Sequence, residues 1–551
     1  MKSARVMWVA SVAVIVVMTS AVPLSAQQKP ISNMQDHTAS SEAADERPTA
    51  LTESGIVIGL RADGINKFLG IPYAAPPVGN LRWRPPKQYG FFPGSILQAT
   101  NFGSQCTQPG GIGSENCLFL NVYTPQSELA DGEGRGLPVM VWIHGGGLES
   151  GSGKFYDSPR LVKNGVILVT INYRLGYLGF FAQSAIDAER HLKGNYGFMD
   201  QQFALKWVRR NIAGFGGDPH QVTIFGESAG GQSVYAQLAS PLAAGLFRGA
   251  IAQSGSYLEF QDYFSYIVTL SVGETTGTPL VPSGAAIANS VGCPSQTASC
   301  LRAVPASTMV GGEAGPYPFV DGTLLPHTIS VAFATGKFNR VPVISGTNHD
   351  EFRLFVAEDY DEVGNPILTS AEYDTAVEAL WSPGLPLPWW VIARYPFASY
   401  PFGGEALGAS GTDGIFSCPA RNAVRLLSQS VTTYAYEFND ENAPPPQSEF
   451  PWLTFPLGAY HGADLLYLFK NTSYFAFGGG KLSPEQVRLS DAMISYWTQF
   501  AKTGDPNSPG RPVWSPYSSS TDEFQSFIPP TPAVEYNFDA SHQCSTFWGT
   551  F

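Results

Sequence analysis

The chain is poor in charged residues, and the charge that it carries is mostly negative. Only 14% of its 551 residues are charged, with 32 lysines and arginines against 45 aspartates and glutamates. Nucleic acids and anionic membranes attract basic surfaces, so neither is expected as a main partner. With 44% hydrophobic and 13% aromatic residues, the composition favours a large folded body with an extensive core and excludes a disordered or coiled-coil protein.

Long apolar runs are also missing. The most apolar stretch, residues 6–18, is shorter than the roughly 20 residues of a membrane-spanning helix. It follows Lys2 and Arg5 and precedes small residues up to Ala26, which is typical of a secretory signal peptide. We therefore predict a signal peptide over residues 1–26, a flexible segment over residues 27–48 and a secreted or periplasmic protein with no stable membrane span after cleavage.

Cysteines are few, and none has the Cys-x-x-Cys spacing of a zinc site, so no metal is expected. In an exported chain the six cysteines are expected to form disulfides, although sequence alone allows many pairings. Closeness in sequence favours two short pairs and leaves a long-range tie for the C-terminal tail: Cys106 with Cys117, Cys293 with Cys300, and Cys418 with Cys544.

Strand-like apolar runs alternate with long helical or irregular stretches after residue 50. This pattern predicts an α/β fold with a mostly parallel central sheet flanked by helices. No linker, charge block or repeat divides residues 49–551, so one domain is expected. A helix is expected over residues 200–212, and another begins at Ser483 with capping residues. Segments 261–292 and 359–417 are expected to be large insertions over the carboxyl edge of the sheet. The strand-like runs are residues 138–143, 166–173, 222–225, 341–345 and 432–438.

The pentapeptide Gly-Glu-Ser-Ala-Gly at residues 226–230 joins a β-branched run to helix-forming residues. Glycines on both sides of a serine allow the sharp strand-to-helix turn that exposes a catalytic nucleophile. The bare pattern arises easily by chance in a glycine-rich chain, so the flanking strand and helix carry the argument. Ser228 is the predicted nucleophile.

A serine hydroxyl needs a general base and an acid that orients this base. In sheets with such a turn the chain order is serine, acid, histidine, which excludes four of the eight histidines because they precede Ser228. His461 lies in a glycine-flanked segment after the run 432–438 and is the predicted base. His327, His349 and His542 are interpreted as surface or structural residues.

The acid is expected just beyond a strand, and the segment after residues 341–345 contains Asp350 and Glu351 side by side. Spacing alone does not show which of the two residues is the acid. Oxyanion stabilisation needs backbone N–H donors, and the residues His144 to Gly147 after the run 138–143 can supply them. The N–H of Ala229 would be a further donor.

Several long motifs in order make the chain resemble the type B carboxylesterases, relatives of the cholinesterases within the α/β-hydrolases. The similarity runs from about residue 50 to 520. Its motifs lie at residues 68–79, 81–86, 115–122, 172–174, 215–219, 226–230, 253–256 and 496–501.

The resemblance implies an α/β-hydrolase fold and assigns roles to individual residues. It selects Glu351 as the acid and His461 as the base, and it supports the same disulfide pairs. It implies that Arg82 and Glu115 form a structural ion pair. The other implied roles are an oxyanion hole of Gly146, Gly147 and Ala229, electrostatic support from Glu227, and a hydrogen bond near the acid from Ser254.

Two positions and one segment depart from the family pattern. Asn116 replaces an aspartate, and Phe352 replaces the glycine that follows the acid, so a different position of the acid loop is expected. The segment between Cys106 and Cys117 has no tryptophan. Cholinesterases hold quaternary ammonium on an aromatic ring there, so choline esters are not expected as substrates.

Together these features predict a secreted serine carboxylesterase that hydrolyses small-molecule esters through an acyl-enzyme intermediate without a cofactor. The alternatives are a lipase or an aryl-ester or feruloyl-type esterase on the same fold, and a non-catalytic binding protein related to the cholinesterases. The native ester and the oligomeric state stay open.

Overall fold

The computed structural model describes residues 47–126, 136–256, 268–269, 282–310, 317–382, 388–445, 453–469 and 481–550. The predicted signal peptide and all of the predicted flexible segment except its last two residues lie outside this part of the chain. None of the described helices is both long and apolar enough to cross a membrane.

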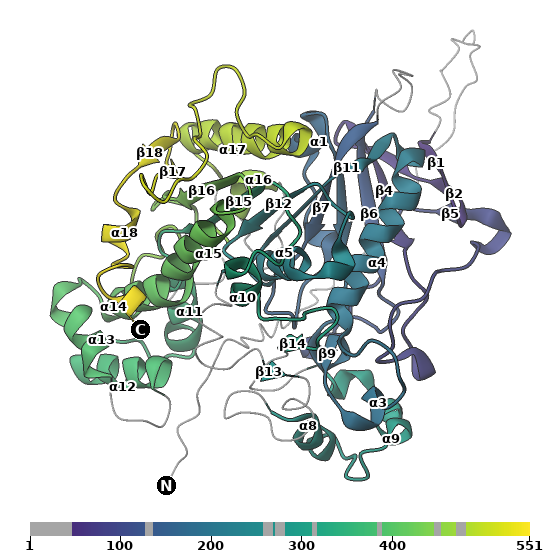
Figure 1. The fold of residues 1–551 in the computed structure, drawn as a ribbon, viewed down its shortest axis with the longest axis horizontal. Helices are drawn as coiled ribbons and strands as arrows, with labels where there is room; N and C mark the ends of the chain where they lie inside the picture. Colours follow the sequence, from purple (N-terminus) through teal and green to yellow (C-terminus); the bar gives the residue numbers. More distant parts are fainter. Residues whose placement is uncertain are drawn as a thin grey trace, which may run out of the picture.

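An 11-stranded sheet runs through the molecule (Figure 1). Its strands from β8 to β17 pair in parallel, and the outer strands pair antiparallel. The predicted mostly parallel α/β sheet is therefore confirmed. In spatial order the strands are β18 (Ala533–Glu535), β17 (Phe524–Phe527), β16 (Thr433–Phe438), β15 (Val343–Asn348), β12 (Gly249–Gln253), β11 (Gly217–Glu227), β7 (Leu137–Ile143), β8 (Ile167–Ile171), β6 (Phe119–Pro125), β4 (Ile65–Pro72) and β3 (Leu60–Ala62).

Helices cover both faces of the sheet, which explains why the central strands are nearly continuous apolar runs. Alternate residues of a strand point to opposite faces. In β7, Val139 and Val141 therefore join one core cluster and Trp142 joins the other. The first cluster includes α4 (Tyr196–Asn211), α5 (Ala229–Ala239) and α15 (Cys418–Ser428), and the second includes α1 (Pro159–Lys163) and α17 (Pro484–Thr503).

The helix expected at Ser483 forms as α17. The Ser483 hydroxyl accepts from the N–H of Gln486, and the Gln486 side chain accepts from the N–H of Ser483. This reciprocal capping satisfies two N–H groups that have no partner inside the helix.

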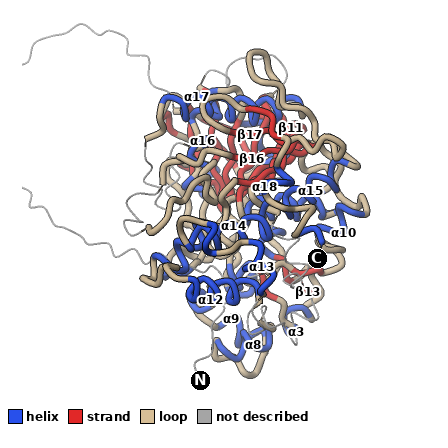
Figure 2. The backbone as a smooth tube through the Cα atoms, turned by 90° about the vertical axis from the view of Figure 1, so that its left-hand side faces the viewer, coloured by secondary structure: helices blue, strands red, loops and turns tan. Residues whose placement is uncertain are grey.

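The described part of segment 359–417 is mainly helical rather than irregular. With α8 and α9, its helices α12 and α13 lie beyond one end of the sheet (Figure 2). The remaining helices are α2 (Gly176–Gly179), α3 (Ser184–Asp187), α8 (Gly284–Ser290), α9 (Ala298–Ala303), α10 (Ile329–Ala334), α11 (Arg353–Val356), α12 (Ser370–Trp381), α13 (Trp389–Arg394), α14 (Gly403–Gly411), α16 (Leu465–Leu468) and α18 (Phe538–Ser541). Short strands outside the main sheet are β1 (Thr49–Thr52), β2 (Gly55–Ile58), β5 (Ile96–Gln98), β9 (Phe180–Phe181), β10 (Gly194–Asn195), β13 (Val268–Thr269) and β14 (Phe319–Val320).

Three disulfides are present, and one of them, here called the tail disulfide, ties the C-terminal segment to the start of α15. The pairs are Cys106–Cys117, Cys293–Cys300 and, as the tail disulfide, Cys418–Cys544. Beyond the tail disulfide, the Trp548 ring packs against the Trp381 ring of α12 in a tilted arrangement, with 4.5 Å between the ring centroids. The tail therefore packs against the helices inserted between β15 and β16.

Candidate active site

Ser228 lies on the turn between β11 and α5, at the carboxyl edge of the sheet. Its backbone has φ 56° and ψ −127°, a conformation that L-residues avoid and that the surrounding packing must enforce. Its N–H donates to the Gln253 carbonyl at 2.9 Å, and its carbonyl accepts from the N–H of Gln232 at 2.8 Å. The side chain is partly exposed, so it is accessible to a substrate.

The glycines around Ser228 allow close packing of strand and helix. A Cβ atom on Gly230 would lie 2.0 Å from the Ile143 carbonyl oxygen, and one on Gly226 would lie 2.6 Å from the Gly230 carbonyl carbon. Any side chain at these positions would push α5 away from β7 and β11. The sequence pattern is thus required by the geometry of the turn.

Glu351 follows β15 and is fully buried. Its Oε1 accepts from the Thr347 hydroxyl at 2.8 Å and from the Asn348 N–H at 2.7 Å. Its Oε2 lies 2.5 Å from Nδ1 of His461. The carboxylate is therefore held by its own loop and directed at the imidazole.

Asp350, the neighbouring carboxylate, has a different environment. Its Oδ2 accepts from the Ala459 N–H at 2.9 Å, and its Oδ1 pairs with Arg353 at 2.8 Å. The Asp350 N–H donates to the Ala459 carbonyl at 3.0 Å. Asp350 thus fastens the acid loop to the segment that carries His461, whereas Glu351 contacts the imidazole itself.

The His461 ring is almost fully buried and packs against a pair of stacked aromatic rings. Phe355 of α11 and Phe416 lie 5.0 Å and 5.2 Å from it, centroid to centroid. Its Nε2 is 3.2 Å from Oε1 of Glu227, the residue that precedes Ser228. Within the described part of the chain, no hydrogen bond joins the Ser228 hydroxyl to His461, so the outer nitrogen faces Glu227 in this state.

Burial and charge shift the pKa values of this group. Burial raises the pKa of Glu227 to about 8. For His461, burial lowers the pKa, but the carboxylates of Glu227 and Glu351 outweigh it and raise it to about 9. The site therefore stabilises an imidazolium, which is the charged form that a general base passes through.

The loop after β7 passes beside Ser228. A Cβ atom on Gly145 would lie 3.1 Å from Cβ of Ser228. Gly146 and Gly147 have φ values of 99° and 62°, and both are at least partly exposed. Ala229 begins α5, so its N–H has no partner within that helix. The backbone N–H groups of these two segments can therefore donate to one oxygen atom next to Ser228.

His144 supports this loop, a role that the sequence did not predict. Its Nδ1 hydrogen-bonds to the Gly145 carbonyl at 2.8 Å, and its ring stacks 4.4 Å from that of Tyr173. The Tyr173 hydroxyl donates to the His144 carbonyl at 2.7 Å. Burial lowers the His144 pKa to about 4, so the ring is neutral and Nδ1 donates. No sequence pattern connects Tyr173 with this loop.

Ser254 requires a correction. Its hydroxyl is buried and has no hydrogen-bond partner among the described residues, so the expected bond near the acid is not made. Glu351 is held instead by Thr347, Asn348 and His461. Ser254 contributes its N–H instead, which donates to the Gly346 carbonyl at 2.9 Å.

Asp464, three residues after His461, was also missed. It is fully buried, and its Oδ2 accepts from the Gln253 amide at 2.6 Å. Gln253 also accepts from the Trp497 indole at 3.1 Å. Burial raises the Asp464 pKa to about 6. Gln253 therefore links the strand beside Ser228 to the segment beside His461.

The departures from the family pattern leave these contacts in place. Arg82 pairs with Glu115 through two bonds of 2.6 Å and 2.7 Å, although Asn116 follows. Phe352 is buried, and a Cβ atom on Gly411 of α14 would lie 2.3 Å from its ring. The glycine in α14 makes room for Phe352, and Glu351 still reaches His461.

Known proteins resemble this chain along most of its length. The model of the carboxylesterase family matches residues 46–546. An acylcarnitine hydrolase of Mus musculus is 34% identical in an alignment of 487 residues that covers 82% of this chain and 81% of that protein. A para-nitrobenzyl esterase of Bacillus subtilis (strain 168) is 34% identical over 494 residues, covering 86% and 93%. A solved structure titled PNB esterase superposes with a TM-score of 0.71 at 31% identity, covering 90% of this chain and 99% of that one.

Proposed function

The chain belongs to the carboxylesterase family of the α/β-hydrolases and is a carboxylic ester hydrolase, and on this basis we propose that Ser228 is its nucleophile. His461 is the proposed general base, and Glu351 is the acid that orients it. The observation that carries the proposal is the 2.5 Å contact between Glu351 Oε2 and His461 Nδ1, because it fixes the tautomer that leaves Nε2 free to take a proton.

The reaction would proceed in two steps. The Ser228 oxygen attacks the ester carbonyl while His461 Nε2 takes the hydroxyl proton, and the proton then passes to the leaving alcohol. Water, activated by the same imidazole, cleaves the acyl-enzyme and regenerates Ser228. For both steps His461 moves its Nε2 from Glu227 toward the serine oxygen. Glu227 then acts on the imidazolium through its charge.

The proposed oxyanion hole consists of the N–H groups of Gly146, Gly147 and Ala229. Negative charge develops on the carbonyl oxygen in the transition state, and donors fixed before the reaction stabilise it most effectively. The neutral, stacked His144 ring supports this role because it holds the Gly145 carbonyl at 2.8 Å.

The two rings that pack against His461 indicate the type of ester. Phe355 and Phe416 offer apolar contact beside the base, so the preferred substrates are small-molecule esters with an apolar group next to the ester bond. We also propose that residues 49–551 act as a single domain and that the protein is exported, because three disulfides form where the environment is oxidising.

The test compares S228A with S254A in hydrolysis of a chromogenic short-chain ester. Both variants lose one hydroxyl, but the Ser254 hydroxyl has no hydrogen-bond partner to lose among the described residues. S228A is expected to abolish turnover without changing the melting temperature greatly, whereas S254A keeps most of the activity. Substantial turnover by folded S228A would refute the assignment of the nucleophile.

A further inference from the structure

A second group of chemically active side chains lies beside the acid loop. His349 precedes Glu351 by two residues, Glu437 stands in β16, and His542 belongs to the C-terminal tail. Their possible ligand atoms all lie within 4.8 Å of one another. Among the described residues, these three form the cluster of histidine, cysteine or acidic side chains that could hold a metal ion. The proposed ester chemistry uses none of the three.

The two imidazoles converge on one carboxylate oxygen. Nδ1 of His349 lies 2.9 Å from Oε1 of Glu437, and Nε2 of His542 lies 2.6 Å from the same oxygen. The two rings are 5.2 Å apart, centroid to centroid. With zinc–nitrogen bonds of about 2.1 Å at a tetrahedral angle, the centroids of two bound imidazoles would be about 5 Å apart. The separation of the two rings therefore matches that of a coordinated pair, and the Glu437 oxygen would move away from the two nitrogens to admit the ion.

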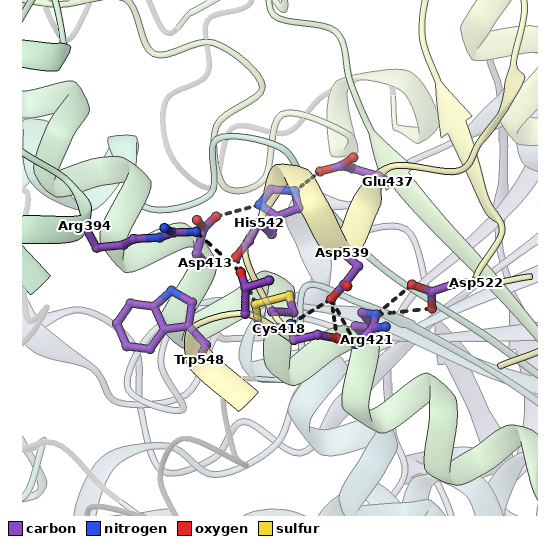
Figure 3. Close-up of a disulfide and its surroundings, with 12 residues drawn as sticks. Arg394, Asp413, Cys418, Arg421, Glu437, Asp522, Asp539, His542 and Trp548 are labelled. Atoms are coloured by element: carbon purple, nitrogen blue, oxygen red, sulfur yellow. Dashed lines mark hydrogen bonds and ion pairs between the residues drawn. A yellow bond between two sulfur atoms is a disulfide. The ribbon is translucent and has the colours of Figure 1, made fainter. Parts of the chain in front are cut away.

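The group also has the supporting contacts that metal sites need. Nδ1 of His542 lies 2.6 Å from a carboxylate oxygen of Asp413, and Figure 3 shows Asp413 and Glu437 on opposite sides of the His542 ring. A carboxylate on the far nitrogen of a ligating histidine fixes the ring and makes it a better ligand. On the other oxygen of Glu437, the Asn439 amide donates at 3.2 Å.

The burial of the three residues suits an ion that enters from one side. The Glu437 and His542 side chains are 0% and 3% exposed, whereas His349 is 32% exposed. Solvent can therefore reach the group past His349, and water can complete the coordination. Asp413 and Glu437 bring two carboxylates to the site.

We propose that His349, Glu437 and His542 bind a divalent transition-metal ion of the zinc type. Two imidazoles and a carboxylate suit zinc and its neighbours, whereas calcium and magnesium prefer oxygen ligands. The ion would tie the acid loop and β16 to the tail, close to the tail disulfide. The sequence suggested no metal because these ligands lie far apart in the chain and have no short spacing motif.

The experiment measures metal uptake by the full chain after treatment with a chelator. Zn²⁺ is titrated calorimetrically, and bound zinc is counted by elemental analysis after desalting. Co²⁺ then serves as a spectroscopic probe, because tetrahedral coordination gives intense visible absorption. The variants are H349N, at the most exposed ligand, and H220N, which changes an exposed histidine outside the group.

We expect about one equivalent of Zn²⁺, at least a tenfold weaker affinity in H349N and no change in H220N. Zinc should also raise the melting temperature of the wild type and of H220N but not of H349N, because an ion that binds only the folded state stabilises it. H349N is used only if its melting curve without metal shows a folded protein; otherwise H349Q replaces it.

Two results would overturn the proposal. If the wild type takes up no zinc and shows no tetrahedral cobalt spectrum, the three side chains are held together by hydrogen bonds alone. If H349N binds zinc as tightly as the wild type, the ion sits elsewhere. Neither result bears on Ser228, so the ester chemistry is tested separately.

Discussion

Replacing Glu351 with glutamine is expected to lower kcat by about 10³–10⁴-fold, because an amide cannot satisfy both sets of contacts that the carboxylate makes. Oε1 accepts from the Asn348 N–H at 2.7 Å, a backbone donor that cannot reverse its direction. The glutamine carbonyl oxygen must therefore face Asn348. Its NH₂ group is then left facing His461.

In the wild type, a Glu351 oxygen lies 2.5 Å from His461 Nδ1. In E351Q an NH₂ group takes the place of this oxygen, so Nδ1 of the His461 ring must accept a hydrogen bond. Its proton then moves to Nε2, and the lone pair that should take the proton of Ser228 is lost. The expected factor corresponds to about 4–5.5 kcal/mol of activation free energy, at about 1.4 kcal/mol for each factor of ten.

The matched control is D350N, which makes the same chemical change one residue earlier. The new amide oxygen can still accept from the Ala459 N–H, and only the 2.8 Å ion pair with the partly exposed Arg353 weakens. The assay is steady-state hydrolysis of a chromogenic ester by folded variants. If E351Q retained more than about a tenth of kcat, or if D350N lost more activity than E351Q, Glu351 would not be the orienting acid.

Three other variants test separate parts of the structure. E227Q removes the carboxylate that lies 3.2 Å from Nε2 of His461. Because this carboxylate helps to hold the His461 pKa at about 9 against the lowering effect of burial, the acid limb of the kcat/KM profile should move to lower pH by about one unit or more; an unchanged limb would contradict this. In G230A the new Cβ atom would lie 2.0 Å from the Ile143 carbonyl oxygen, so activity and melting temperature should both fall, whereas G90A, which places its Cβ atom in open space, should resemble the wild type. Changing both cysteines of the tail disulfide to serine opens a loop with a sequence separation of 126 residues and should lower the free energy of unfolding by about 2–5 kcal/mol in denaturant titrations; equal stability would show that the tail is held by packing alone.

The central strands could be predicted from the sequence because helices cover both of their faces. β7, β8 and residues 222–225 of β11 form nearly continuous apolar runs, and this pattern requires burial on both sides. β12 was missed, although it lies between β11 and β15. Its residues are mostly small, and small residues give no strand signal of their own; the packing of α5 against it requires them.

The site was predictable where a local turn determines it and unpredictable where contacts join distant segments. Ser228 could be found from its glycines together with the strand-like and helix-forming residues that flank them. Asp350 and Glu351 could not be distinguished by spacing, because both follow the same strand, and the difference lies in their partners at Ala459 and His461. Asp464 meets Gln253 only when β12 and the segment after β16 come together.

The most direct test of the proposed chemistry is covalent labelling with a fluorophosphonate, followed by mass spectrometry of the peptides. The wild type should gain one phosphonyl adduct on Ser228 and lose its esterase activity at the same rate. E351Q should be labelled far more slowly, because the same base activates the serine for this reaction. An unlabelled Ser228 in an active protein, or an adduct on another residue that accounts for the loss of activity, would contradict the account.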